Sequence, residues 1–267
     1  MPNEGTASYQ RILGHLRRAV TDYHMLSPGD HIAVGVSGGS DSMVLLLGLW
    51  RLGQFLGISF KLTAVSVDPQ FNGLPANFSP IEELCRELSI PYYIERTVIG
   101  ELVFQVRRED NPCSLCARMR RGALTLAAER LGCNKLALGH NLDDAVETFV
   151  MNLLWEGRIG CFSPFTDYSL PDEGASCGET PRREVPCGKE KELRRIAVIR
   201  PLVYTQSKEI RRAARDCGLE CFKLPCPNDG KSGRQAAREW IRQQERLYPG
   251  VKQRLFGAMV RGNISGW

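Results

Sequence analysis

Six consecutive residues, Ser37–Ser42 (SGGSDS), have the residue types and spacing that point most directly to a chemical task. They follow an apolar run, residues 31–36, that predicts a strand, and they precede an apolar run, residues 43–50, that predicts a helix. The first N–H groups of a helix have no intrahelical partner and lie at the positive end of the helix dipole, so such a turn can bind phosphate. Two glycines let the backbone approach an anion closely, and three hydroxyls add donors. The predicted phosphate-binding residues are Val36, Ser37, Gly38, Gly39, Ser40, Asp41 and Ser42.

The glycine spacing bears on which nucleotide chemistry this turn performs. A Walker loop needs G-x-x-x-x-G-K, and the Gly-Lys-Ser triplet at 230–232 has no glycine at the required position before it. The dinucleotide spacing G-x-G-x-x-G is also absent from the turn. The sequence SGGxDS after a strand resembles the loop of the PP-loop ATPases, which cleave ATP between the α and β phosphates and adenylate a substrate. A Ser/Gly-rich turn that only caps the following helix is the alternative.

Three of the ten cysteines are placed as metal ligands would be. Cys113 and Cys116 stand in C-x-x-C spacing at the start of a predicted helix, which puts both sulfurs on one side. Cys226 lies between Pro225 and Pro227, which restrict the local backbone. Three thiolates suit zinc or an iron–sulfur cluster with one open iron, and a redox-active pair is the third alternative. The spacing alone does not choose among these three.

Four further motifs make the chain similar to a known family. They are Cys113–Gly122 (CSLCARMRRG), 138–144 (LGHNLDD), 200–202 (RPL) and Pro225-Cys226, in this order. Together with SGGxDS they resemble the tRNA 2-thiocytidine synthetases, a branch of the tRNA-thiolating PP-loop enzymes, over residues 10 to 260 or so. The resemblance implies ATP and Mg²⁺ as cofactors. It also implies a 4Fe–4S cluster held by Cys113, Cys116 and Cys226, whose open iron holds the incoming sulfur. A further cysteine that the family often has after the third ligand is absent here.

The reaction that the resemblance implies replaces the C2 oxygen of a cytidine in the tRNA anticodon loop by sulfur. This oxygen is a poor leaving group until it is adenylated, after which sulfur attacks and AMP departs. The implied partners are tRNA, a sulfur donor such as a cysteine desulfurase or free sulfide, and a second copy of the chain in a homodimer. The implied catalytic residues are Asp41, Arg120, Asp144 and the three cysteines, Cys113, Cys116 and Cys226.

Three charged residues of this set each have a second interpretation. Asp41 is expected to position Mg²⁺, or it is only an acidic residue favoured at a helix N-terminus. Asp144 is implied as an acid/base group or a Mg²⁺ ligand, and Asp143 is the alternative cap of the helix that begins there. Arg120 stands where related thiolases carry a catalytic lysine. Since arginine is not a base, Arg120 is expected to stabilise phosphate or adenylate charge, unless it belongs to a solvated helix face.

Residues that directly follow predicted strands are expected to meet in one crevice, because ligands of parallel sheets bind beyond the carboxyl ends of the strands. These residues are Ser37, Asp68, Gly139 and His140. Asp68 is expected at the nucleoside half of ATP. His140 is expected either to contact phosphate or to be a structural histidine.

Alternating strands and helices predict an α/β fold, a Rossmann-like parallel sheet with helices on both faces. Beyond the loop, we expect strands at 60–67, 91–95, 135–138 and 196–198 and helices at 8–26, 80–88, 117–131, 143–155, 206–217, 233–246 and 250–260. Residues 161–195, rich in proline and glycine, are expected to be a loop insertion. The expected division is an N-terminal helical segment (1–30), a PP-loop ATPase domain (31–220) and a C-terminal segment (221–267).

Composition sets limits on the class of protein. The net charge of +5 permits a nucleic-acid partner without requiring one. The sequence shows neither a signal-peptide pattern nor an apolar run long enough to span a membrane, so we expect a soluble, cytoplasmic protein without membrane contact. The resemblance also implies that four of the other cysteines, 85, 133, 217 and 221, are ordinary apolar residues.

Arginines near the end of the chain are the candidate RNA contacts. Four of them recur every four residues and form one stripe on a predicted helix: Arg234, Arg238, Arg242 and Arg246. Such a stripe either binds phosphates or is an exposed face paired with Glu239 and Glu245. Three further arginines precede it, Arg211, Arg212 and Arg215.

Two other functions compete with tRNA thiolation. One is a PP-loop desulfidase or sulfur-inserting enzyme that acts on a small molecule with the same three thiolates. The other is a non-catalytic, zinc-stabilised protein that binds RNA or a nucleotide. Formation of AMP and pyrophosphate that depends strictly on tRNA separates the first from tRNA thiolation, and metal analysis separates the second.

Overall fold

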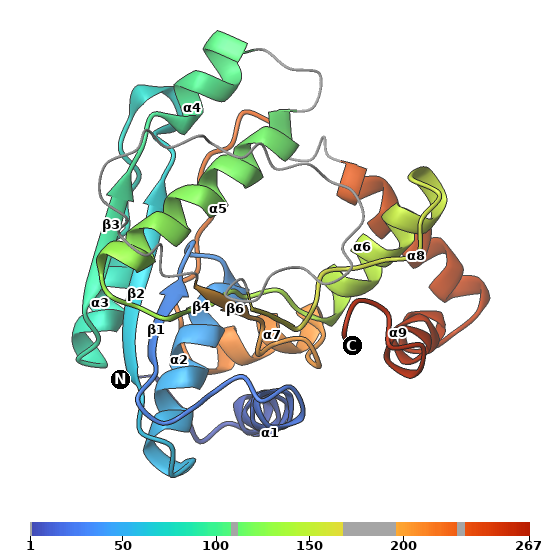
Figure 1. The fold of residues 1–267 in the computed structure, drawn as a ribbon, viewed down its shortest axis with the longest axis horizontal. Coiled ribbons are helices and arrows are strands. Elements are labelled where there is room, and N and C mark those ends of the chain that lie inside the picture. Colours follow the sequence, from blue (N-terminus) through green and yellow to red (C-terminus); the bar gives the residue numbers. More distant parts are fainter. Residues whose placement is uncertain (1, 108–111, 168–195, 229–232) are drawn as a thin grey trace, which may run out of the picture.

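Six strands form one sheet in the order β3-β2-β1-β4-β6-β5 (Figure 1). The structure, a computed structural model, describes residues 2–107, 112–167, 196–228 and 233–267. All neighbouring strands are parallel except β5 and β6. In chain order the strands are β1 (His31–Gly35), β2 (Lys61–Asp68), β3 (Tyr92–Arg96), β4 (Lys135–Ala137), β5 (Phe165–Thr166) and β6 (Ala197–Ile199). The strand order reverses between β1 and β4, and the crevice beyond the carboxyl ends of those two strands is where such sheets bind ligands.

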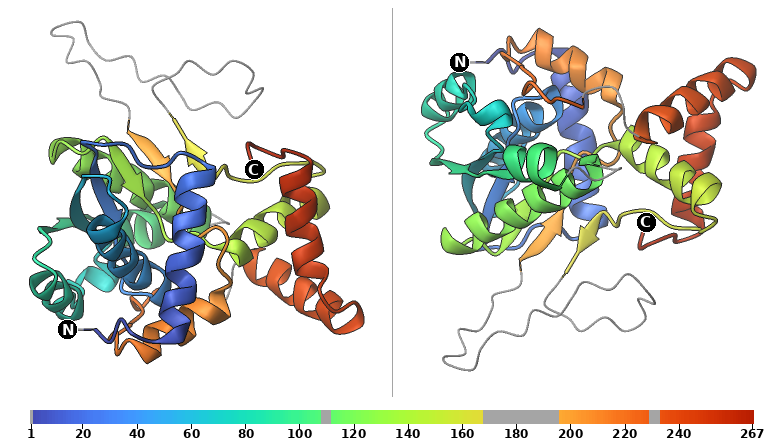
Figure 2. Two further views of the ribbon diagram at one scale, coloured as in Figure 1. Left: turned by 90° about the horizontal axis from the view of Figure 1, so that it is seen from below. Right: turned by 90° about the horizontal axis from the view of Figure 1, so that it is seen from above.

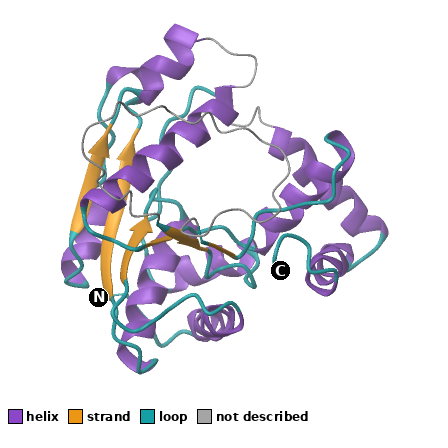
Figure 3. Ribbon diagram, viewed as in Figure 1, coloured by secondary structure: helices purple, strands orange, loops and turns teal. Residues whose placement is uncertain are grey.

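The helices confirm the predicted α/β class (Figure 3). They are α1 (Ala7–Asp22), α2 (Ser40–Phe55), α3 (Ser79–Glu87), α4 (Ile99–Glu101), α5 (Pro112–Arg130), α6 (Leu142–Trp155), α7 (Ser207–Asp216), α8 (Gly233–Leu247) and α9 (Val251–Arg261). Except at α4, predicted and observed bounds agree within a few residues. The largest shift is at α5, whose first turn contains both cysteines of the C-x-x-C motif.

Helices cover both faces of the sheet. On one face, Ala127 and Ala128 of α5 pack against strand residues such as Val65 and Leu136. On the other face, α2 is buried along most of its length, and α1 and α7 pack against it. Gly48 of α2 lets α1 approach closely, since a Cβ there would lie 2.4 Å from Leu16 Cδ1. This burial fixes the N-terminal end of α2 at the end of β1.

The C-terminal helices α8 and α9 pack together against α6 and stand beside the sheet rather than on it (Figure 2). Val146 and Val150 of α6 form an apolar cluster with Ala237 and Ile241 of α8. The space between α7 and these helices is therefore lined on one side by a helix that packs on the sheet domain and on the other side by α6 and α8. The predicted division at residues 30 and 220 stays a prediction.

Two features were not predicted. A short helical stretch, α4 followed by a π-helical turn at Leu102–Arg107, stands where no element was expected. The predicted loop at 161–195 begins with β5, which pairs antiparallel to β6. Two strand residues are too few to show a period of two in a sequence. The rest of that insertion, 168–195, lies outside the described residues.

No helix in the described ranges is both long enough and apolar enough to cross a membrane.

Candidate active site

The SGGSDS turn joins β1 to α2, and its own hydroxyl groups hold it in shape. The Ser37 N–H donates to Ser42 Oγ over 3.0 Å, and Ser42 Oγ in turn donates to the Gly39 carbonyl over 3.0 Å. Because its proton is used inside the turn, Ser42 braces the loop rather than donating to a phosphate. Gly39 caps α2 without a side chain, so the first N–H groups of the helix face outward.

Gly38 adopts a backbone conformation that favours glycine, with φ of +84°. Its carbonyl accepts a hydrogen bond of 2.9 Å from the Phe222 N–H. A Cβ on Gly38 would lie only 2.4 Å from Phe222 Cζ. The ring of Phe222 therefore packs directly on the turn at Gly38. The same ring packs edge-on against Phe78, with 6.1 Å between the ring centroids.

A cavity of about 330 Å³ lies over the turn at the ends of β1 and β4, and we call it the loop cavity. A Cβ on Gly139 would stand 3.2 Å from the backbone of Asp41 and Ser42, so the turn after β4 packs directly on the start of α2. The cavity brings together eight predicted site residues: Val36, Ser37, Asp41, Ser42, Arg120, Gly139, His140 and Asp144. Arg121 lines it as well.

Asp41 lies in the first turn of α2, and Ser40 Oγ donates to its carboxylate over 3.3 Å. Burial, with a further contribution from the nearby Asp144 carboxylate, raises the pKa of Asp41 to about 6. Burial also raises the pKa of Asp144, while the Arg234 guanidinium, 3.4 Å from its Oδ1, opposes the shift. Two partly buried carboxylates that line one cavity favour a bound cation.

Asn141, and not Asp143, caps α6. Its side chain accepts from the Asp144 N–H, and the Asp144 carboxylate accepts from the Asn141 N–H, which makes a capping box. Asp143 instead accepts from the Ser207 N–H and pairs with Lys252 Nζ at 2.6 Å. The cap predicted as the alternative role of Asp143 is therefore wrong.

His140 is buried against the ring of Phe162, with 5.0 Å between ring centroids. Burial, reinforced by the Arg200 guanidinium, lowers the pKa of His140 to about 3. Its Nδ1 has no hydrogen-bond partner among the described residues. His140 is thus a neutral ring at neutral pH and supplies no positive charge to a phosphate.

Asp68 does not line the loop cavity. Its carboxylate is buried and accepts hydrogen bonds from the backbone N–H groups of Gln70 and Ala76, at 2.9 and 3.1 Å. These bonds hold the turn that follows β2. The structure therefore does not bring Asp68 together with the other predicted site residues.

The three predicted ligand thiols, Cys113, Cys116 and Cys226, line a second cavity of about 340 Å³, which we call the cysteine cavity. Burial raises the pKa of Cys116, while the nearby Arg120 guanidinium opposes the shift. Asn228 Nδ2 donates to Cys113 Sγ over 2.9 Å. In the described parts of the chain, no three His, Cys, Asp or Glu side chains stand close enough together to hold a metal ion as placed. A cavity lined by three thiols and no carboxylate nevertheless has the donor set of a thiolate-held metal group.

The two cavities share a wall. Ser37 of the turn and Ala117 and Arg120 of α5 line both of them. A group bound at the phosphate-binding turn and a group bound at the thiols would therefore lie on either side of the Arg120 guanidinium.

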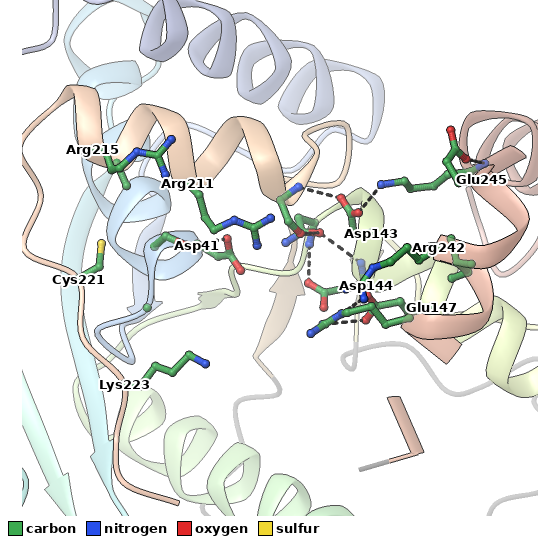
Figure 4. Close-up of a pocket in the computed structure, with 18 of the residues that line it drawn as sticks. Asp41, Asp143, Asp144, Glu147, Arg211, Arg215, Cys221, Lys223, Arg242 and Glu245 are labelled. Atoms are coloured by element: carbon green, nitrogen blue, oxygen red, sulfur yellow. Dashed lines mark hydrogen bonds and ion pairs between the residues drawn. The ribbon is translucent and has the colours of Figure 1, made fainter. Parts of the chain in front are cut away.

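A third and larger space, of about 1070 Å³, opens between α7, α6 and α8, and we call it the large cleft (Figure 4). It reaches the turn at Gly39, Ser40 and Asp41. Arg211 of α7 extends toward Asp41, and its positive charge partly opposes the rise in the pKa of that carboxyl. Cys221, predicted to be an ordinary apolar residue, is exposed and lines the cleft, whereas Cys85, Cys133 and Cys217 are buried as expected.

The arginine stripe of α8 has mixed roles. Arg234 pairs with Asp144, and Arg238 pairs with Glu147 through two bonds of 2.7 and 3.1 Å. Arg242 pairs with Glu239 on its own helix. Glu245, predicted as another partner, accepts backbone N–H groups of Gly250 and Lys252.

We expect Arg238→Ala to lower the free energy of unfolding by ~2 kcal/mol, because it leaves the buried Glu147 carboxylate without its partner. The loss is smaller than for a fully buried pair, since the Arg238 side chain is 50% exposed. Arg242→Ala, which breaks an exposed pair on the same helix, should change it by less than ~0.5 kcal/mol. Urea unfolding of both variants measures the difference, and equal losses would contradict the assignment.

Sequence patterns did not identify two residues of the site, Phe222 and Lys223. Phe222 supports Gly38, and Lys223 lines both the large cleft and the cysteine cavity. The only available signal was their position shortly before Cys226, since nothing in their spacing relates them to the turn.

Comparisons with known proteins show which family and which fold the chain is similar to. A family model described as a PP-loop domain matches residues 10–245. The chain is 34% identical to the tRNA-cytidine(32) 2-sulfurtransferase of Geobacter metallireducens, over 94% of this chain and 90% of that protein. It is 33% identical to the protein of the same name from Syntrophotalea carbinolica, over 99% and 93%. Among solved structures, the U34-tRNA thiolase NcsA from Methanococcus maripaludis with its 4Fe–4S cluster has the same fold. The TM-score is 0.70 at 24% identity, over 95% of this chain and 79% of that one.

Proposed function

Because the chain belongs to the PP-loop family, in the branch of the tRNA-cytidine 2-sulfurtransferases, we propose that it replaces the C2 oxygen of a tRNA cytidine by sulfur at the expense of ATP. The single observation that carries the proposal is the wall shared by the loop cavity and the cysteine cavity. Activation by ATP and delivery of sulfur must act on the same carbon atom. A site that does both needs its phosphate-binding turn and its sulfur-binding groups next to each other.

The turn binds the pyrophosphate half of ATP. The outward N–H groups at the start of α2 and the positive end of its dipole face the loop cavity. Gly38 and Gly39 add no side chains to the turn itself, and Ser37 lies at the shared wall with its hydroxyl. His140, a neutral ring at neutral pH, lines the cavity without adding charge to it.

Asp41 and Asp144 are the proposed holders of Mg²⁺, since they are the two carboxylates of the loop cavity. The ion would neutralise the phosphates that leave. Both carboxylates have raised pKa values as placed, and a divalent cation between them favours their charged forms.

Arg120 is the proposed link between the two halves of the reaction. Its guanidinium is permanently charged, so it can stabilise the adenylate without exchanging a proton. The thiols of Cys113, Cys116 and Cys226 would hold a 4Fe–4S cluster, which when bound offers an open iron for the incoming sulfur. The proposal also includes a sulfur donor, which is either a cysteine desulfurase or free sulfide. It further includes a homodimer and a location in the cytoplasm.

The test uses protein reconstituted without oxygen, with ATP, Mg²⁺, sulfide and unmodified tRNA. Digested nucleosides are identified by mass spectrometry. We expect a 2-thiocytidine peak that requires ATP and disappears in Cys226→Ala, because this variant lacks the third thiolate. Cys133→Ala, which removes a buried thiol packed among strand residues away from both cavities, is the matched control and should keep the peak.

The remaining outcomes discriminate between functions. No thiolated nucleoside from protein with an intact cluster would contradict tRNA thiolation and favour an enzyme that transfers sulfur to a small molecule. About one equivalent of zinc without iron would favour a binding protein stabilised by zinc.

A further inference from the structure

Four cations of the large cleft have no partner of their own. They are Arg211 and Arg215 on α7, Lys223 after it and Arg246 on α8. Their side chains are exposed, and none of them forms a hydrogen bond or ion pair with a described residue. Arg211, Arg215 and Lys223 lie on α7 and the segment that follows it (Figure 4). Arg246 lines the same cleft from α8.

The carboxylates of the same cleft, apart from Asp41, are already partnered. Asp143 pairs with Lys252, Asp144 with Arg234 and Glu147 with Arg238. Glu245 accepts two backbone N–H groups, and Asp41 accepts from the Ser40 hydroxyl and forms no ion pair with a described residue. Asp41 is thus the one described carboxylate of the cleft that is set against the four cations. The unpartnered cations therefore dominate the charge that the cleft offers to a ligand.

The cleft connects with both halves of the proposed reaction. It contacts the phosphate-binding turn at Gly39 and Asp41, and Lys223 belongs to the linings of both the cleft and the cysteine cavity. A chain that lies in the cleft would thus have one of its units beside the site of adenylation and beside the thiols. The phosphates of ATP bind at the turn itself, so the four cations remain available to a second polyanion.

We propose that Arg211, Arg215, Lys223 and Arg246 bind the phosphodiester groups of a single-stranded RNA segment on both sides of the nucleotide that enters the active site. The inference rests on the proposed function and adds to it the surface along which the RNA strand lies. Single-stranded RNA fits because its nucleotides can turn out of the strand, whereas a base inside a duplex cannot reach an enclosed site. The path excludes Arg234 and Arg238, which the sequence equally suggested, because carboxylates of α6 occupy them.

The experiment compares two double variants that lose the same charge. Arg215→Gln with Arg246→Gln removes one cation from each side of the cleft, and neither residue contacts the turn or the thiols. The control, Arg18→Gln with Arg86→Gln, removes two exposed arginines that pair with carboxylates on their own helices, α1 and α3, and line no part of the cleft. Fluorescence anisotropy of the unmodified tRNA at several salt concentrations gives the dissociation constant and its salt dependence.

We expect the cleft variant to bind tRNA ~10-fold more weakly than the wild type. The plot of log affinity against log salt concentration should become less steep by about two units, one for each phosphate contact that is lost. Its ATP affinity should equal that of the wild type. Arg215→Lys with Arg246→Lys should keep most of the wild-type binding, since lysine also contacts phosphate as a point charge.

Two results would overturn the inference. If the cleft variant and the control have the same slope as the wild type, the RNA lies elsewhere, while the proposed function stands as long as the wild type thiolates tRNA. If the wild type neither binds nor thiolates tRNA, the proposed function fails together with the inference.

Discussion

Gly38→Ala should abolish ATP binding at the turn and lower the free energy of unfolding by ~2–4 kcal/mol. The φ of +84° at this position is strained for any residue with a Cβ. The new methyl group would also stand 2.4 Å from Phe222 Cζ, and the ring is held by its own packing against Phe78. Isothermal titration with ATP and urea unfolding measure the two effects.

Gly39→Ala is the matched control, since its φ of −72° is ordinary and the nearest atom to a new Cβ, Ser37 Oγ, lies 3.8 Å away. It should change stability by less than ~1 kcal/mol. Adding Phe222→Ala to Gly38→Ala should recover the part of the loss caused by the clash and leave the part caused by backbone strain. A Gly38→Ala variant that binds ATP normally would show that the turn does not need this conformation.

Asp41→Asn should lower the rate of ATP-dependent thiolation on the order of 100-fold, because it removes a proposed Mg²⁺ ligand. The same substitution should raise the free energy of unfolding of the nucleotide-free protein. Burial raises the pKa of Asp41 from 3.8 to about 6. Between those two values the folded protein keeps a proton that the unfolded chain has released. The stability of the wild type therefore falls as pH rises through this window and stays lower above it.

The asparagine variant has no proton to lose there, so the two proteins should differ by up to ~3 kcal/mol at pH 8 and by little near pH 4. Urea unfolding at several pH values, without nucleotide or metal, measures this difference. Glu83→Gln removes an exposed carboxylate instead and should leave the pH profile of stability unchanged. A constant difference between wild type and Asp41→Asn at all pH values would contradict the raised pKa.

Local patterns predicted the elements that position the site. The apolar run after Ser42 packs on the sheet as α2, and the short run at 135–138 forms β4 beside β1. The turn follows β1 and Gly139 follows β4. Because neighbouring parallel strands end at the same edge of the sheet, these two elements are enough to bring the turn and Gly139 together. The burial of Asp41 follows from the same arrangement.

Contacts between residues far apart in the chain account for what the sequence did not predict. Whether an arginine of α8 meets a phosphate or a carboxylate depends on which face of α6 lies opposite, and periodicity does not encode this. Asp68 follows a strand as a ligand-binding residue would, yet backbone N–H groups of its own turn occupy both carboxylate oxygens. Phe222 and Gly38 are 184 residues apart and meet only in the folded chain.

That last contact has a thermodynamic consequence. The Phe222 N–H bonds to Gly38, and Cys226 follows four residues later on the same segment. Coupling between two binding sites is reciprocal in free energy. If nucleotide binding at the turn orders this segment, it strengthens binding of the group that Cys226 anchors by some factor. Binding of that group must then strengthen nucleotide binding by the same factor. The affinity for ATP would then report on the integrity of the proposed cluster, and a chain that had lost this cluster would also bind ATP less tightly.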